Sequence, residues 1–243
     1  MQPVRRFDTL YEQVLGTLRT AIVEGDIGPG SVLSVPEIAT RLGVSRSPAR
    51  EAILQLQNEG LVSILPRRGA VVLDGTLTDV EQIFQYREPL EGAAAALAAR
   101  RIDPVSLDAL RAALEAHTEA VRVADLEQHV VLDEQFHLGF IEACGNARII
   151  DSLRSVRAQL RVVTRRLSAE QGALSDDMVA AHQAIFHAIE TGDAVKAERV
   201  ARSHVRGVLE FYQQHASAFP ARGSGPVGVD PLPVSETPDK SDE

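Results

Sequence analysis

Residues 34–53 read SVPEIATRLGVSRSPAREAI, and this stretch decides the fold of the N-terminal part of the chain. Ser34 and Glu37 have the spacing of a capping box, which predicts the start of a short helix. Gly43 supplies a tight turn, and Ser45 is placed to cap the next helix. The stretch therefore predicts two helices that are joined by a tight turn.

The segments on either side of this stretch are also periodic. Before it, apolar side chains recur every fourth residue between residues 9 and 24, which predicts another helix. After it, two short apolar segments, 61–65 and 70–73, flank the turn 66–69 and predict a β-hairpin. Three helices followed by a hairpin form a winged helix-turn-helix module, which we expect over residues 1–74.

A winged helix-turn-helix module presents the start of its third helix to the major groove of DNA. Arginine can form two hydrogen bonds to guanine, and serine hydroxyls suit phosphates or base edges. The hairpin tip places positive charge where the adjacent phosphates or the minor groove would lie. A protein-interaction module remains the alternative, because arginines also cover apolar surface without binding a partner. The candidate DNA-binding residues are Ser45, Arg46, Ser47, Arg50, Arg68 and Gly69.

The rest of the chain divides into two parts. Residues 78–216 contain six amphipathic helical patterns with short connections, which predict an antiparallel all-α bundle. Residues 220–243 are rich in Pro, Gly, Ser and acidic residues, and we expect a disordered tail there. The fold class is therefore mostly α, with the winged module first and the bundle second.

Composition limits the functions that this chain can have. The 243 residues carry a formal net charge of −9, which argues against a general polyanion-binding coat. The acidic excess lies outside residues 1–74, which hold 8 basic and 8 acidic side chains. A single cysteine excludes an internal disulfide, and no apolar stretch approaches the ~20 residues of a membrane span. We therefore expect a cytoplasmic protein with no membrane partner.

Four polar residues interrupt the apolar pattern of the predicted bundle. Asp133 and His137 are four residues apart on one helix face, so both side chains can reach one ion. His182 and His204 stand at similar heights if their helices form a hairpin. One carboxylate and three imidazoles suit Zn²⁺, Ni²⁺, Mn²⁺ or Fe²⁺, with zinc expected in a purified sample. Any one of these histidines taken alone is more typical of a surface or core position, and His129 is expected at the periphery.

Two further residues are candidates for contact with a bound ligand. Arg87 lies among apolar neighbours, so we expect a carboxylate partner, which is either Glu91 or a bound acid. Asn146 is most simply a helix cap, and ligand contact is the other interpretation. The arginines at 154, 157, 161 and 165 are typical of a solvated helix face, although one of them could line a pocket.

The N-terminal motifs together resemble the GntR family of bacterial transcriptional regulators. The segments IGPGSVLS (27–34) and LGVSRSPAREAI (42–53) carry this resemblance, which covers about residues 10–73. Pro36 stands where some members of the family have a basic residue that touches DNA, so we assign no contact there.

The second half resembles the FCD ligand-binding domain of the FadR-like branch, in its VanR-like, six-helix form. The motifs Asp133-x-x-Phe136-His137 and Ala181-His182 carry this resemblance, which spans about residues 78–215. It implies that Asp133 and the three histidines bind a divalent metal, and that a small organic acid joins the metal through its carboxylate.

These observations lead to one main expectation and two alternatives. We expect a homodimer that binds a pseudo-palindromic operator and acts as a metal-dependent, small-carboxylate-responsive regulator, with repression as the expected mode. Arg87 and Asn146 are the candidate effector contacts. The alternatives are a metal-sensing regulator without an organic effector, and a metal-dependent hydrolase, for which no dedicated general base is apparent.

Overall fold

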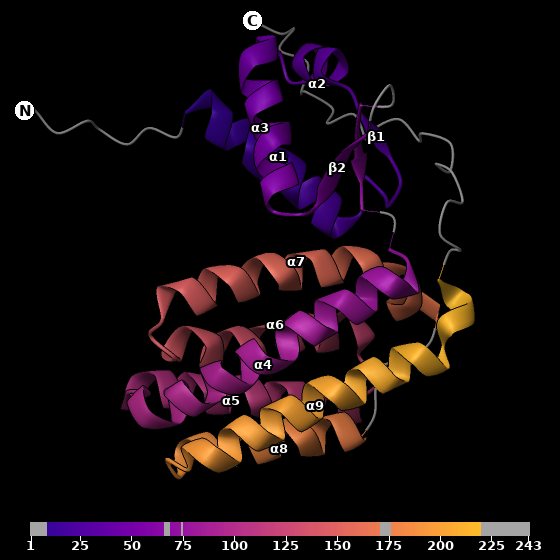
Figure 1. Cartoon of the computed structure of the whole chain (residues 1–243). Helices are drawn as coiled ribbons and strands as arrows, with labels where there is room; N and C mark the ends of the chain where they lie inside the picture. Colours follow the sequence, from indigo (N-terminus) through magenta and orange to yellow (C-terminus); the bar gives the residue numbers. More distant parts are fainter. Residues whose placement is uncertain (1–8, 66–68, 74, 171–175, 220–243) are drawn as a thin grey trace, which may run out of the picture. The chain divides into compact units, whose positions relative to one another are not determined.

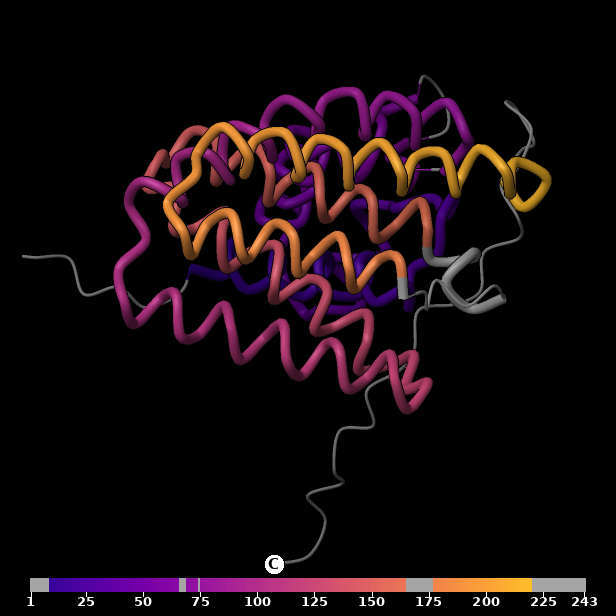
Figure 2. The backbone as a smooth tube through the Cα atoms, turned by 90° about the horizontal axis from the view of Figure 1, so that it is seen from below, coloured from indigo at the N-terminus to yellow at the C-terminus, as the bar shows by residue number. Residues whose placement is uncertain are grey.

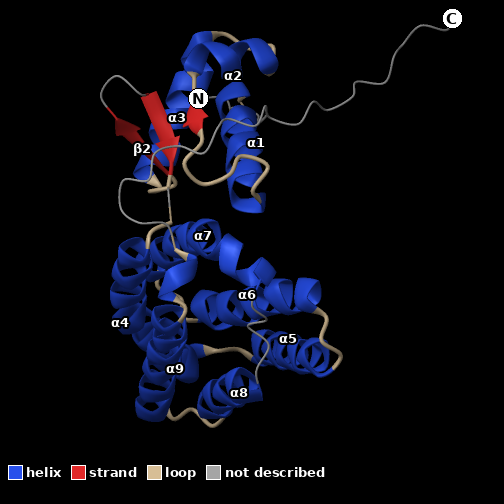
Figure 3. Cartoon of the chain, turned by 90° about the vertical axis from the view of Figure 1, so that its right-hand side faces the viewer, coloured by secondary structure: helices blue, strands red, loops and turns tan. Residues whose placement is uncertain are grey.

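The computed structural model contains two compact units, which meet in sequence near residue 74. The structure describes residues 9–65, 69–73, 75–170 and 176–219. Among these residues, all strands lie in the first unit, whereas the second unit is built from helices alone (Figure 3).

Three helices and a small sheet form the first unit. Its elements are α1 (Leu10–Glu24), β1 (Val32–Leu33), α2 (Val35–Arg41), α3 (Arg46–Asn58), β2 (Val62–Leu65) and β3 (Gly69–Val72). The sheet has the strand order β1-β3-β2, and both strand pairs are antiparallel. The predicted helices and hairpin are therefore present, and the two-residue strand β1 joins them at the edge of the sheet.

The helix caps of this unit differ from those expected. Thr9 and Glu12 form a complete capping box at the start of α1, whereas Ser34 and Ser45 occupy N-cap positions without a side-chain hydrogen bond. Pro48 at the third position of α3 has no N–H group for Ser45 to bind, whereas Glu37 at the third position of α2 has one that Ser34 leaves unused. The predicted inward face of α1 is buried except for Leu10, which is 60% exposed.

Six α-helices form the second unit, as the sequence predicts. They are α4 (Leu77–Arg101), α5 (Pro104–Arg122), α6 (Leu126–Ala143), α7 (Ala147–Glu170), α8 (Asp176–Glu190) and α9 (Ala194–Gln214), followed by the short 3₁₀-helix η1 (Ala216–Ala218). Figures 1 and 2 show α4 and α9 running side by side, and these two helices make the most extensive contact in the chain. α4 starts slightly before the expected boundary at residue 78, because Thr76 and Asp79 form its capping box.

Small residues let α4 approach its neighbours closely. Ala94, Ala95 and Ala98 are fully buried on one face of α4. A Cβ atom at Gly92 would lie 2.6 Å from Cγ of Arg202 on α9, so any other residue there would force the Arg202 side chain to shift. Phe136, Phe140, Leu110 and other buried apolar residues fill the core that these helices enclose.

No helix in the described ranges combines the length and apolar character that a membrane crossing requires.

Candidate metal centre and DNA-facing helix

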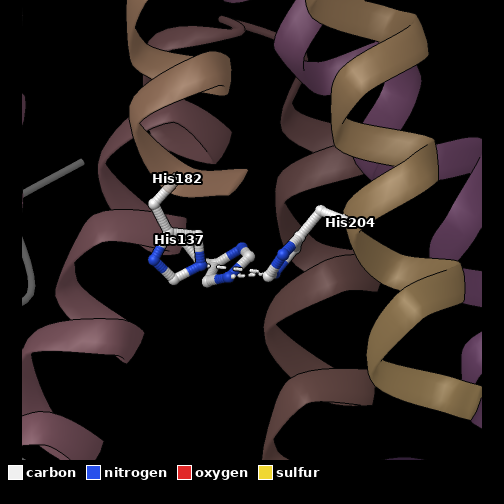
Figure 4. A group of neighbouring side chains, drawn as sticks. All are labelled: His137, His182 and His204. Atoms are coloured by element: carbon white, nitrogen blue, oxygen red, sulfur yellow. Dashed lines mark hydrogen bonds between the residues drawn. The ribbon is translucent and has the colours of Figure 1, made fainter. Parts of the chain in front are cut away.

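Four side chains from three helices converge inside the second unit. His137 on α6, His182 on α8 and His204 on α9 point their Nε2 atoms toward one another (Figure 4). The Nε2 atom of His204 lies 3.3 Å from that of His137 and 3.3 Å from that of His182. Asp133 Oδ1 lies 3.9 Å from Nε2 of His137 and 3.6 Å from Nε2 of His182. The structure therefore brings all four predicted donors to one place.

The geometry of these donors fits a divalent cation. Two nitrogens that bind one tetrahedral ion at about 2.0 Å lie about 3.3 Å apart, which is the separation seen here. Burial, together with the nearby His137, lowers the pKa of His204 to about 3. Burial and the neighbouring His204 also hold the pKa of His182 well below its ordinary value. Neutral imidazoles with facing lone pairs are suited to metal binding.

A buried carboxylate and two buried arginines surround the donors. Glu91 on α4 places Oε2 3.3 Å from Nδ1 of His137, close but without the alignment of a hydrogen bond. Its Oε1 atom accepts a hydrogen bond of 2.7 Å from Nε of Arg87 and one of 3.3 Å from Arg157. Arg157 also contacts Asp133 at 3.5 Å and Glu134 at 2.7 Å. Arg157 belongs to a stripe typical of a solvated face, one member of which could line a pocket, and the structure buries Arg157 in the lining of the cavity beside the donors.

The charges of this cluster favour an added cation. Two guanidinium groups face three carboxylates, which leaves one negative charge in a buried region. Burial alone would raise the pKa of Asp133, but His137, His182 and Arg157 beside it lower that pKa below its ordinary value. Burial likewise acts to raise the pKa of Glu91, and Arg87 overcomes this effect, so the carboxyl stays ionised. A divalent ion would bring the local charge to plus one.

A small cavity of about 110 Å³ opens beside the four donors. Polar side chains in its lining include Arg87, Asp133, His137, Arg157, Arg161 and His204. Arg161 lines this cavity, is exposed, and forms no ion pair with an acidic group in the described part of the chain. The cavity can therefore hold a small anion next to the donor set.

The two candidate effector residues have different positions. Arg87 lines the cavity and is paired with Glu91, which is the internal partner that the sequence allowed. Oδ1 of Asn146 accepts backbone hydrogen bonds from Arg148 at 3.1 Å and Ile149 at 3.4 Å. Asn146 therefore caps α7, the simpler of its two expected roles, and it is not among the residues that line this cavity.

Two more histidines, His129, which is expected at the periphery, and His117, which has no expected role, continue from His182. His117 on α5 is fully buried, and His129 on α6 is 4% exposed. His182 Nδ1 lies 3.4 Å from His117 Nδ1, and His117 Nε2 lies 2.9 Å from His129 Nδ1. The spacing of His117 does not predict this position, because it does not show that α5 packs against α6 and α8 at the height of His182.

The first unit presents the candidate DNA-binding residues of α3 on its surface. Ser45, Arg46, Ser47 and Arg50 are all exposed at the start of α3. Arg46, Ser47 and Arg50 line a concave groove together with Gly69 of β3. This groove therefore gathers residues from α3 and the hairpin that lie far apart in the sequence.

Details of the groove refine the role of each residue. Within the described part of the chain, neither Arg46 nor Arg50 has a recorded ion pair, so both guanidinium groups are available to a partner. Ser47 Oγ donates a 2.9 Å hydrogen bond to Glu51, so its hydroxyl has an internal partner. Gly69 adopts a φ of 85°, a backbone conformation that favours glycine. Arg68 lies outside the described residues.

Comparison with known families identifies both units. Residues 10–72 match the family described as bacterial regulatory proteins, gntR family, and residues 82–207 match the FCD domain. An uncharacterized HTH-type transcriptional regulator in an unstable DNA locus of Streptomyces ambofaciens is 32% identical over 194 residues, which cover 79% of this chain and 80% of the relative. The HTH-type transcriptional repressor RspR of Escherichia coli K12 is 29% identical over 203 residues, covering 84% and 89% of the two chains.

A solved structure shows the same fold. McbR/YncC of E. coli superposes with a TM-score of 0.71 at 22% identity, over 86% of this chain and 100% of that one. The matching families and relatives are transcriptional regulators and not enzymes, which sets aside the hydrolase alternative. This chain therefore belongs to the GntR family of DNA-binding transcriptional regulators and carries an FCD domain in its second half.

Proposed function

We propose that this chain is a metal-dependent transcriptional repressor that responds to a small carboxylate. The observation that carries this proposal is the convergence of Asp133, His137, His182 and His204 beside a small cavity with arginines in its lining. Repression is supported by the name of the E. coli relative RspR. In this proposal, residues 1–74 bind DNA and residues 78–216 bind the metal and the effector.

The metal would be held by the three Nε2 atoms and the Asp133 carboxylate. When bound, a divalent ion supplies a Lewis-acidic centre that attracts an anionic ligand to its open position. Glu91 orients His137 from behind, as carboxylates commonly do for metal-binding histidines. We expect zinc in a purified sample, with nickel, manganese and iron as the other ions that suit this donor set.

The effector would be a small organic acid. The cavity of about 110 Å³ has room for only a few non-hydrogen atoms. Arg161 at the mouth has a charge that no described acidic group neutralises, so it can pair with a carboxylate of the ligand. The charge and the size of the cavity together favour a short acid over a long apolar chain.

The DNA-binding surface would be the groove that contains Arg46, Ser47, Arg50 and Gly69, and Ser45 and Arg68 would be further DNA contacts. Two such surfaces in a homodimer would match a pseudo-palindromic operator. Effector binding would shift operator affinity by the difference in its affinity for the two conformations of the dimer.

One observation favours a second candidate, a metal sensor without an organic effector. Arg87 and Arg157, the two buried arginines of the cavity, already pair with Glu91 and Glu134. In a pure metal sensor these ion pairs would complete the environment of the metal ion, and no organic acid would be needed for the response to the metal.

Thermal unfolding separates these candidates. Zinc should raise the unfolding midpoint of chelator-treated protein, and one acid from a panel of lactate, malonate, citrate and benzoate should raise it further only when zinc is present. His204→Ala should lose both effects, while His187→Ala, at an exposed histidine of α8, should keep them. A full response in His204→Ala would contradict the proposed site, and a response to zinc without any acid response would favour the metal sensor.

Operator binding tests the DNA-facing helix. We expect Arg46→Ala and Arg50→Ala each to weaken binding by about 1–3 kcal/mol per lost base contact, measured by gel shift on an operator selected from random DNA. Arg199→Ala, at an exposed arginine of α9, makes the same charge change and should leave binding unaltered. Unchanged affinity in both α3 variants would exclude this helix as the recognition element.

A further inference from the structure

The buried histidines of the second unit form a chain that continues beyond the donor set. His182 faces the other donors with Nε2 and faces His117 with Nδ1, at 3.4 Å from its Nδ1 atom. His117 in turn places Nε2 2.9 Å from Nδ1 of His129. All three rings are at most 4% exposed. The two contacts beyond the donor set, His182–His117 and His117–His129, therefore each join two ring nitrogens.

The chemistry of neutral imidazole limits how protons can be arranged along this chain. A neutral histidine has one N–H group and one lone pair, and the partner of one nitrogen decides the state of the other. In one arrangement His182 Nδ1–H donates to His117 Nδ1, and His117 Nε2–H donates to His129 Nδ1. Every N–H group then points away from the donor set. The lone pair of His182 Nε2 is left free to bind a cation.

The opposite arrangement is the only other one in which both contacts remain hydrogen bonds between neutral rings. His129 would donate to His117, and His117 Nδ1–H would donate to His182 Nδ1. The single proton of His182 would then reside on Nε2, directed at His204, and would block metal binding. The direction of the chain therefore decides whether His182 can be a ligand.

We propose that His117 and His129 are positioning residues that hold His182 in the tautomer with a free Nε2 lone pair. This inference rests on the proposed metal site. Burial supports it, because no water competes for the Nδ1 atom of His182, which is 0% exposed. His129 also lines the small cavity, so the far end of the chain has polar surroundings in which its own N–H group can be satisfied.

The same atoms permit one different arrangement. His117, Asp133 and His182 also form a group whose donor atoms lie within 4.8 Å of one another. This group shares Asp133 and His182 with the first set. The 2.9 Å contact between His117 and His129 is compatible with both arrangements, so the number of bound ions distinguishes them.

The test measures metal binding by the full-length chain after chelator treatment. Zinc affinity is determined by competition with a chromophoric chelator, and the coordination is followed by the absorption spectrum of bound Co²⁺. His117→Phe keeps a ring but removes the acceptor, and we expect about a 10- to 100-fold loss of zinc affinity. His117→Asn offers an amide oxygen near the position of Nδ1 and should recover most of that loss. His187→Phe is the matched control at an exposed histidine.

The outcomes separate the relay from the metal site itself. Wild-type affinity and an unaltered Co²⁺ spectrum in His117→Phe would overturn the relay and leave the metal site standing. Two zinc ions per wild-type chain, with one lost in His117→Phe, would replace the relay by a second ion. Absence of zinc binding by the wild-type chain would instead defeat the proposed function and the relay with it. If His117→Phe does not fold, His129→Phe removes the next link and should lower the affinity in the same direction.

Discussion

The buried histidines should make the metal-free protein less stable in mild acid. In the folded chain, burial lowers the pKa of His204 to about 3, whereas an unfolded chain leaves it at an ordinary value of about 6.5. Between these values the unfolded state binds the proton that the folded state excludes. Stability is therefore fully present above the unfolded pKa and falls as the pH drops below it.

The size of the effect follows from the two pKa values of His204. Moving from about pH 7.5 to about pH 5.5 should cost about 1.3 kcal/mol from this residue alone. His182 acts in the same direction, because burial also lowers its pKa. Glu91 and Asp133 have pKa values below their ordinary ones, so both stay ionised over this interval and contribute little.

Urea unfolding of chelator-treated protein measures this effect at both pH values. Hydrogen exchange of α8 and α9 peptides follows the second unit specifically. His204→Gln, which cannot titrate, should lose about 1 kcal/mol less between the two pH values than the wild type does. His187→Gln, at an exposed position, should behave as the wild type. An equal acid loss in His204→Gln and the wild type would refute the assignment of this pH dependence to the buried donor set.

The remaining predictions concern Arg157, which lies beside the donor set, and Gly75, which precedes α4. Arg157→Met should lower the free energy of unfolding in urea by about 3–5 kcal/mol, because it leaves buried carboxylates unpaired. Adding Glu134→Gln should restore part of this loss. A loss below about 1 kcal/mol would contradict the argument that Arg157 forms buried ion pairs. Gly75→Ala should cost about 1–3 kcal/mol, because Gly75 has a φ of 75° and its Cβ position lies 3.1 Å from Cα of Val163. Thermal unfolding should show Gly16→Ala, in open space within α1, to be neutral or stabilising, and equal effects at both glycines would count against a strained boundary.

Local rules predicted much of the fold. The turn at Gly43, with a φ of 64°, and the hairpin between residues 61 and 73 depend on neighbouring residues, so their signals survive in the sequence. The strand β1 was missed because two residues carry no periodicity, and Val32 is a strand only through its distant partner Val71. The expected cap at Ser45 lacks its donor because Pro48 has no N–H group, and the structure offers no such reason for the missing bond at Ser34.

The candidate site was predicted in part, for a similar reason. Spacing along single helices placed Asp133 beside His137, and the expected hairpin placed His182 level with His204. The residues that surround the four donors could not be predicted from spacing along single helices. Arg157 has the spacing of an exposed stripe, and only the packing of α7 against α4 and α6 turns it inward.

The position of Gly75 has a consequence for how the start of α4 is held against α7. The residue rests against the backbone of Val163 on α7 and immediately precedes the capping box of α4. The start of the bundle is thus held in place by α4 and α7, the two helices that carry Glu91 and Arg157. A ligand that weakens the ion pair between Arg157 and Glu91 would therefore act on the same two helices that meet at Gly75.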